Sequence, residues 1–396
     1  MNLEHFPQAN LSQPLTYLDS SGSTLTLTSV IEAMTEYYTC YRANTHSGLY
    51  SWSHQATRKC QESRELIAQR LHCSPEELIF TRGATDGLNM IAEWLTPRLS
   101  SEQSIVLSIA EHHSNLLPWQ QLSNHTGACL QYTGLDQGRI NVQEICDNIN
   151  DKTAVVAITQ VSNVLGSITD LSSIIKKAKK HNALVIVDGC QALAHLPVNL
   201  HDIEADFYVF SGHKVYGPTG IGVLYGRYNL LQNMPTLRTG GAMISEVTKH
   251  SFTPAPLPHR FEPGTLPIAE IIGLGQAIDW LNTQYATIQK QEQNLISVIL
   301  TKCQERPWIH IIGPETNHHR IGCFAFHIEG IHPHDITYLL AQKNIAVRGG
   351  HHCAQPLINL YNIPGSTRLS LGVYNTLEDI DRFFTALDEI YDLFHT

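Results

Sequence analysis

Four short apolar runs in the middle of the chain constrain its fold more than any other feature. They span residues 104–109, 153–159, 183–188 and 206–210, and each is continuous rather than alternating. This pattern is typical of strands that are covered on both faces. Helical stretches such as residues 171–183 lie between the runs, and strands that alternate with helices form a mainly parallel sheet. The sequence therefore predicts an α/β fold in which helices flank this sheet.

The last part of the chain is richer in amphipathic helix. Apolar residues recur at helical spacing after Thr376, and we expect one buried face there, made of Leu377, Ile380, Phe383, Phe384, Leu387, Tyr391 and Phe394. Thr376, with Asp379 three residues later, is typical of a helix N-cap. The 396 residues suffice for more than one domain. We predict a large domain over residues 17–280 and a smaller α/β domain made of residues 1–16 and 281–396.

Composition and charge argue against several classes of function. The net charge of −10 gives no attraction to nucleic acid or to an anionic membrane surface. The start of the chain lacks the pattern of a secretory signal, and no apolar stretch reaches the roughly 18 residues of a membrane span. The nine cysteines are scattered without CxxC spacing, which argues against a disulfide framework and a zinc knuckle. We expect a protein of the reducing cytoplasm with free thiols.

Polar residues follow all four predicted strands at the point where each strand ends. In chain order they are Glu111, His112 and His113, then Asn163, then Asp188 and Gln191, and finally Ser211, His213 and Lys214. Ligands bind outside the carboxyl ends of the strands in open α/β sheets, so we expect these side chains to meet. Surface loops without a function would place such residues after one or two of the strands by chance. Four occurrences indicate a functional site.

A glycine-rich turn adds a fifth element to this site. Residues 81–87, TRGATDG, precede an apolar helix, and the free N–H groups at the start of a helix suit a phosphate. Capped helices are common, so the turn alone is a weak signal. Beside Ser211 and His213 it predicts a phosphate site that includes Ala84 and Thr85.

Lys214 stands in a segment whose glycines indicate close packing, SGHKVYGPTGIGVLYG. A lysine after a strand is usually a solvated surface residue. A desolvated lysine, in contrast, loses proton affinity and becomes a nucleophile. Asp188, at the end of a buried strand, needs a cationic partner. The two residues are therefore candidates for the chemical centre of the site.

Six motifs occur together in this chain: TRGATDGLN, AEHHSNLLPWQ, QVSNVLG, VDGCQA, SGHKVYGPTGIGVLYG and RGGHHCAQP. Together they resemble the class V aminotransferase-like enzymes of fold type I, which use pyridoxal 5′-phosphate. Within that family they are similar to the group II cysteine desulfurases, which include the SUF-type desulfurases and the cysteine sulfinate desulfinases. The resemblance extends from Tyr17 to the helix after Thr376. It implies a homodimer that acts on L-cysteine or a related amino acid.

The resemblance implies roles for the residues around the cofactor ring. Lys214 would bind pyridoxal phosphate covalently and later move a proton at the substrate's Cα. Asp188 would keep the pyridine nitrogen protonated, and His112 would stack on the ring. Gln191 and Asn163 would hydrogen-bond the phenolic oxygen of the ring.

The same resemblance implies which residues bind the phosphate and the substrate. The phosphate would lie against Ala84, Thr85, Ser211 and His213. Thr265 would reach it from the second subunit. Arg368 would bind the substrate carboxylate, a task that suits a planar guanidinium, and Arg348 is a second candidate for substrate binding.

Cys353 separates a desulfurase from other enzymes of the fold. It follows a basic and flexible segment, RGGHH, and such a setting favours the thiolate. By resemblance it would take the substrate's sulfur as a persulfide and pass it to a small sulfur-acceptor protein. The neighbouring histidines could instead suggest a metal site, but adjacent residues rarely point at one ion, and no metal is expected.

Some residues depart from the family pattern. Ser47 stands where an arginine is common, Ala84 where a second threonine is frequent, and FEPGTLPIAE differs on both sides of its Gly-Thr pair. Another reaction of the same fold stays open at this point: an aminotransferase, a kynureninase-like lyase or an epimerase would need no reactive cysteine. Selenocysteine and cysteine sulfinate are further candidate substrates. A scaffold without activity would retain no cofactor.

Overall fold

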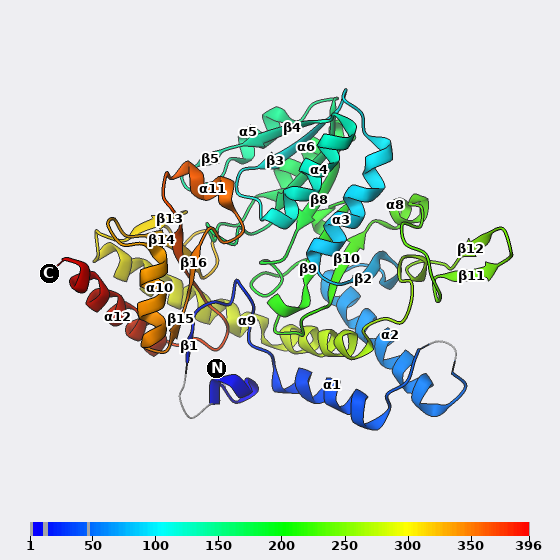
Figure 1. Ribbon diagram of the computed structural model, residues 1–396, viewed down its shortest axis with the longest axis horizontal. Helices are drawn as coiled ribbons and strands as arrows, with labels where there is room; N and C mark the ends of the chain where they lie inside the picture. The colour runs from blue at the N-terminus through cyan, green and yellow to red at the C-terminus, as the bar shows by residue number, and fades with distance from the viewer. Residues whose placement is uncertain (1–2, 11–14, 46–47, 396) are drawn as a thin grey trace.

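A computed structural model describes residues 3–10, 15–45 and 48–395, and Ser47 lies outside these ranges. The described residues form a central seven-stranded sheet with the order β2-β10-β9-β8-β7-β3-β4 (Figure 1). Its strands are Leu78–Thr81 (β2), Ser104–Ser108 (β3), Cys129–Thr133 (β4), Thr153–Thr159 (β7), Leu184–Asp188 (β8), Phe207–Ser211 (β9) and Gly222–Gly226 (β10).

The four predicted strands are confirmed as β3, β7, β8 and β9, which lie side by side in the sheet. Each pair of neighbours among them is parallel, and only β10 runs antiparallel to its neighbours β9 and β2 within this sheet as the structure describes it. The predicted α/β class with a mainly parallel sheet is therefore correct. The crossover helix predicted at residues 171–183 is α6, Leu171–Lys180.

Both faces of this sheet are buried, which explains the continuous apolar runs. Successive residues of one strand enter different cores: Ile105 and Leu107 pack into one cluster, and Val106 packs into the other. The first cluster includes α3 (Ala84–Leu95) and α4 (Leu117–Thr126). The second includes α2 (Ser51–Leu71), α6 and the first half of α9 (Ile268–Gln304). Helix α1 (Thr28–Cys40) packs on α9 below the sheet (Figure 1).

Described residues 310–370 form a second, antiparallel sheet with the order β13-β14-β17-β16. Its strands are His310–Ile312 (β13), Cys323–His327 (β14), Arg348–Gly350 (β16) and Ser366–Ser370 (β17). A third core joins this sheet to α10 (Pro333–Gln342), α12 (Leu377–His395) and the second half of α9. The strand β1 (Thr16–Tyr17) pairs in parallel with β15 (Ile345–Ala346). Helix α9 passes residue 280 without a break, so the division into two domains at that residue stays a prediction.

For α12, the predicted N-cap and the burial of the middle turns are confirmed, whereas the predicted burial of the residues at its two ends is wrong. Thr376 and Asp379 cap the helix reciprocally, because each backbone N–H donates to the other residue's side chain, at 2.9 and 3.3 Å. The side chains of Ile380, Phe383, Phe384 and Leu387 are buried. Leu377 and Phe394, in contrast, are 47% and 44% exposed. Only the central turns of the helix pack against the third core.

The remaining elements connect these layers. They are β5 (Leu135–Asp136), β6 (Arg139–Ile140), β11 (Ile244–Val247), β12 (Phe252–Pro254), α5 (Val142–Asn148), α7 (Leu200–Ile203), α8 (Tyr228–Asn233) and α11 (Gln355–Leu360). The hairpin β11–β12 projects from the body of the molecule (Figure 1). Among the residues that the structure describes, no helix has the length and apolar character needed to cross a membrane.

A buried ion pair joins α2 to the segment before α9. Both guanidinium ends of Arg64 donate to the carboxylate of Glu262, at 2.9 and 2.8 Å, and the two side chains are 4% and 1% exposed. Glu262 also accepts from the backbone N–H of Phe80 in β2. Burial by itself would raise the pKa of Glu262, but the charge of Arg64 and these hydrogen bonds outweigh it and hold the pKa below its ordinary value.

Replacing Glu262 with Gln will lower the free energy of unfolding by about 3–5 kcal/mol, because it leaves the Arg64 charge buried and unpaired. Chemical denaturation of the two proteins measures this loss. The matched control is Glu102→Gln on an exposed turn, expected to change stability by less than about 0.5 kcal/mol. A loss from Glu262→Gln no larger than that of the control would contradict the prediction.

Candidate active site

The carboxyl ends of β7, β8 and β9 border a cavity of about 200 Å³, which loops from the second sheet complete. These predicted site residues line it: Ala84, Thr85, His112, Asn163, Asp188, Gln191, Ser211, His213, Lys214, Arg348, Cys353 and Arg368. Glu111 and His113, which were also expected at the strand ends, are not part of the lining. Thr265 is exposed in the turn before α9 and is not part of this lining. Cys353, from a distant segment of the chain, thus lines the same cavity as Lys214 and Asp188.

Lys214 and Asp188 enter the cavity from neighbouring strands. Asp188 ends β8, is 4% exposed and accepts a hydrogen bond of 2.9 Å at Oδ1 from the backbone N–H of Cys190. Lys214 ends a short 3-10 turn directly after β9. The turn starts at Gly212, where a Cβ atom would lie 2.9 Å from the side chain of Ile221. Glycine is therefore needed for the close packing that places Lys214.

Two histidines beside Lys214 are held neutral. Burial, followed by the charge of Lys214, lowers the pKa of His112 to about 4, and the same two causes lower the pKa of His213 to about 4. The Nδ1 atom of His112 accepts a hydrogen bond from the backbone N–H of Ser114, at 3.1 Å. The proton of this ring is therefore on Nε2. His112 can present a neutral ring to the cavity.

The phosphate turn lies at one end of the cavity. Helix α3 begins at Ala84, whose backbone N–H donates to Oγ of Ser211 at 2.9 Å. Gly83 has φ +149°, and a Cβ atom there would lie 3.2 Å from the same oxygen. The hydroxyl of Thr85 shares a hydrogen bond of 2.7 Å with Ser114. The small residues Gly83 and Ala84 thus leave room for an anion at the start of the helix.

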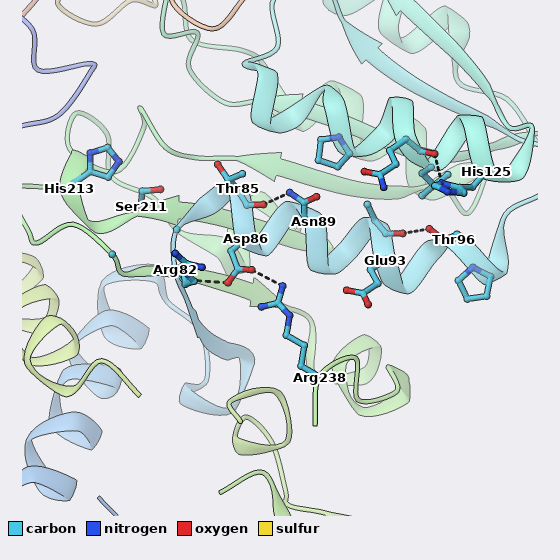
Figure 2. A pocket seen from close by; sticks show the side chains of 17 residues that line it. Arg82, Thr85, Asp86, Asn89, Glu93, Thr96, His125, Ser211, His213 and Arg238 are labelled. Atoms are coloured by element: carbon cyan, nitrogen blue, oxygen red, sulfur yellow. Dashed lines mark hydrogen bonds and ion pairs between the residues drawn. The ribbon is translucent and has the colours of Figure 1, made fainter. Parts of the chain in front are cut away.

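This end of the cavity is open on its outer side. Thr85, Ser211 and His213 also border a second pocket of about 940 Å³, which extends along α3 and α4 (Figure 2). Asp86 also lines this pocket and pairs with Arg238 at 2.8 Å (Figure 2). The predicted phosphate site therefore lies between the cavity and this second pocket.

Asp19 holds both predicted substrate-binding arginines. Its Oδ1 accepts from Nη2 of Arg368 at 3.0 Å, and its Oδ2 accepts from Nη2 of Arg348 at 2.8 Å. Arg368 is 2% exposed and also donates from Nη1 to the carbonyl oxygen of Asn163, at 3.1 Å. Its Nε has no hydrogen-bond partner among the described residues. One carboxylate for two guanidiniums leaves a net positive charge for an anionic substrate group.

The two predicted amide side chains have protein partners in this structure. The side-chain nitrogen of Gln191 donates to the carbonyl oxygen of Ser21, at 2.9 Å, and that of Asn163 donates to the carbonyl oxygen of His352, at 2.8 Å. Their predicted contact with a ring oxygen stays a prediction. Their observed hydrogen bonds tie the first sheet to the loops beside it.

Cys353 lies in the loop between β16 and α11, at the mouth of the cavity. Its residue is exposed, and it follows the buried His352. Both residues have left-handed φ angles, +56° and +52°, which residues with a side chain rarely adopt. Burial, followed by the charge of Arg368, lowers the pKa of His352 to about 3, and its Nε2 lies 3.0 Å from the carbonyl oxygen of Ser366.

Sequence reasoning missed several cavity residues. Ser21, Ser114, Cys190 and His352 line the cavity without a predicted role. Asp19, which holds the two arginines, stands with Ser21 in the N-terminal motif YLDSSGST. The acidic residue in that N-terminal motif was the one available signal. In the described part of the chain, no group of three or more His, Cys, Asp or Glu side chains could hold a metal ion.

The chain belongs to the aminotransferase class-V family, because residues 16–383 match that family. It is 40% identical over 395 residues to a probable cysteine desulfurase of Streptomyces coelicolor, across 98% of this chain and 94% of that protein. Its structure resembles the apo cysteine desulfurase of Thermococcus onnurineus NA1, with a TM-score of 0.94, 35% identity and coverage of 98% and 96%. It also resembles an Escherichia coli cysteine desulfurase with a TM-score of 0.91, 34% identity and coverage of 98% and 97%. The resemblance that the motifs indicated is confirmed.

Replacing His352 with Asn will make the free energy of unfolding less dependent on pH below about 6.5. A buried histidine with a pKa of about 3 takes up a proton on unfolding at pH values between that value and its ordinary value of about 6.5, so its contribution to stability is lost as the pH falls through this range. Asn tolerates the left-handed backbone and does not titrate. We expect the slope of unfolding free energy against pH to fall by up to about 1.4 kcal/mol per unit between pH 6 and 4.

Denaturant unfolding at several pH values measures these slopes. The matched control is His54→Asn, an exposed histidine, whose slope should equal that of the unchanged protein. An unaltered slope for His352→Asn would show that His352 is accessible to protons in the folded state.

Proposed function

We propose that this protein is a pyridoxal-phosphate-dependent cysteine desulfurase, which converts L-cysteine to L-alanine and keeps the sulfur on Cys353. The observation that carries the proposal is the position of Cys353 in the same cavity as Lys214 and Asp188. Relatives that match nearly the whole chain are named cysteine desulfurases. An aminotransferase, lyase or epimerase reaction would leave the cysteine at the cavity mouth without a role, and this alternative is not favoured.

The residues of the cavity fit the cofactor. The start of α3, with Gly83, Ala84 and the oxygen of Ser211, offers donors and space for a phosphate. Asp188 is a buried carboxylate that can hold a pyridine nitrogen protonated, and Lys214 can bind the aldehyde. The neutral ring of His112 can lie against the cofactor without adding charge. When bound, pyridoxal phosphate stabilises negative charge at the Cα of the amino acid.

Each polar group has a task in the proposed reaction. Arg368 binds the carboxylate of cysteine, because its guanidinium is held rigidly by Asp19 and by the carbonyl of Asn163. Arg348 adds positive charge beside it. Lys214 moves the proton at the substrate's Cα. His112, with its proton on Nε2, can donate a hydrogen bond to the substrate.

The thiolate of Cys353 completes the transfer. Its Sγ forms a bond to the substrate sulfur, and the bond between that sulfur and Cβ breaks. The electron pair stays with Cβ, which takes a proton and becomes the methyl group of alanine. Cys353 is left as a persulfide. Because the residue is exposed at the cavity mouth, a small sulfur-acceptor protein can reach it. A cytoplasmic location, and activity on selenocysteine or cysteine sulfinate, stay predictions.

A homodimer fits the open phosphate end. The pocket of about 940 Å³ borders Thr85, Ser211 and His213, and Thr265 of the same chain does not line the cavity. In the dimer, Thr265 of one subunit completes the phosphate site of the other. This arrangement accounts for an exposed Thr265 and an open phosphate site in one chain.

Replacing Cys353 with Ala tests the proposed reaction. It removes the sulfur acceptor, so alanine release from cysteine should fall by on the order of 100-fold or more, whereas the visible absorption of the bound cofactor should persist. Alanine and sulfide are measured with cysteine and a reductant. The matched control is Cys129→Ala, another exposed cysteine, which should retain full activity. If Cys353→Ala keeps full cysteine turnover, the assignment of Cys353 is wrong.

Mixed dimers test the role of Thr265. Lys214→Ala and Thr265→Ala chains should each be impaired alone, in catalysis and in cofactor retention respectively. Combined in one dimer, they leave one cavity with an intact lysine and an intact partner threonine, so mixing should restore up to about half of the normal activity per mixed dimer. Absence of restoration, with subunit exchange verified by mass, would contradict a shared site.

A further inference from the structure

His113 contacts the loop that carries Cys353 and has no task in the proposed reaction. It is half-buried in the turn after β3, next to His112. Its backbone N–H donates a hydrogen bond of 2.7 Å to the carbonyl oxygen of Cys353. Its ring Nε2 accepts one of 3.2 Å from the backbone N–H of Gln355. One residue thus holds the loop on both sides of Ala354.

The ring contact satisfies a need of helix α11. The first N–H groups of a helix have no acceptor within it, and Gln355 is the first residue of α11. The preceding residue, Ala354, has no side chain that could cap the helix. The imidazole of His113 supplies the missing acceptor from a segment that is distant in sequence.

The loop conformation depends on such outside contacts. His352 and Cys353 both have left-handed backbones, which are unfavourable for residues with a side chain. Asn163 donates to the carbonyl of His352 at 2.8 Å, and His113 binds the next carbonyl and the next helix. Within the loop the backbone N–H of Ala354 donates to the carbonyl oxygen of His351 at 2.9 Å, and the bonds from Asn163 and His113 add support from other segments for the position that brings the thiol to the cavity.

We propose that His113 is a positioning residue that clamps the Cys353 loop through its ring nitrogen and so keeps the thiol at the cavity mouth for sulfur transfer. The proposal rests on the proposed function, because it concerns the group that receives the sulfur. The clamp itself exists without turnover and can be measured without it.

The surroundings of His113 favour a neutral ring whose Nε2 can accept a hydrogen bond. The ring must be unprotonated at Nε2 to accept from Gln355. Burial, followed by the nearby His351, lowers the pKa of His113. The ring of His112 is also near, with its centre 6.4 Å from that of His113, and the backbone carbonyl of Cys353 accepts from the His113 N–H.

Two substitutions in the holoenzyme separate the acceptor from the bulk of the ring. His113→Leu keeps much of the volume and removes the acceptor, whereas His113→Gln keeps an acceptor of similar reach. Hydrogen–deuterium exchange of a peptide covering residues 353–360 should be about fivefold faster in His113→Leu, the factor that one hydrogen bond of ordinary strength gives to an opening equilibrium. In His113→Gln it should stay close to that of the unchanged protein. Single-turnover persulfide formation should follow the same order.

Two outcomes would overturn the proposal. One is unchanged exchange in His113→Leu. The other is equal acceleration in both variants with a lower melting temperature, which would mean a general loss of packing. The control His54→Leu should alter neither measurement. If Cys353→Ala retained cysteine turnover, the proposed function would fail, but the exchange result would still report on the clamp.

Discussion

The site depends on the register of three central strands. Thr159 of β7 pairs with Asp188 of β8, and Asp188 pairs with Val209 of β9. Because both faces of the sheet are buried in separate cores, a shift of one residue would turn every side chain to the wrong face. The apolar runs therefore do more than stabilise the fold. They decide which residues stand at the carboxyl edge, and they bring Asp188 and Lys214 into one cavity.

The second sheet contributes the groups that handle substrate and sulfur. Arg368 lies in β17, Arg348 begins β16, and Cys353 follows in the next loop. Asp19 belongs to the N-terminal segment, bridges to Ser370 of β17 and holds both arginines. The proposed cofactor thus binds mainly to the first sheet, and the proposed acceptor of sulfur is carried by the second. The cavity exists only where the two sheets meet.

Site residues at the carboxyl end of a strand could be predicted from the sequence, whereas contacts between segments that are distant in the chain could not. Asp188 and Ser211 end strands, and Lys214 follows one, and the apolar pattern that predicts these strands is local in the sequence. The partners of Gln191 and Asn163 lie on other segments of the chain, and no spacing reveals them. The same holds for Asp19 beside Arg368 and for His113 beside Gln355, which are separated by 349 and 242 residues. The ends of α12 were wrongly predicted to be buried, because helical periodicity does not show where a helix extends beyond the segments that it packs against.

Helix α9 is one continuous rod of 37 residues, about 55 Å long. Ile271 and Ile278 lie in a core of the first sheet, and Leu295 and Ile299 lie in the core of the second. A hinge motion between the two sheets would have to bend this rod and separate apolar surfaces at both ends. Substrate entry and product exit therefore fall to loop movements at the cavity mouth, and the two halves of the molecule behave as a single stiff frame.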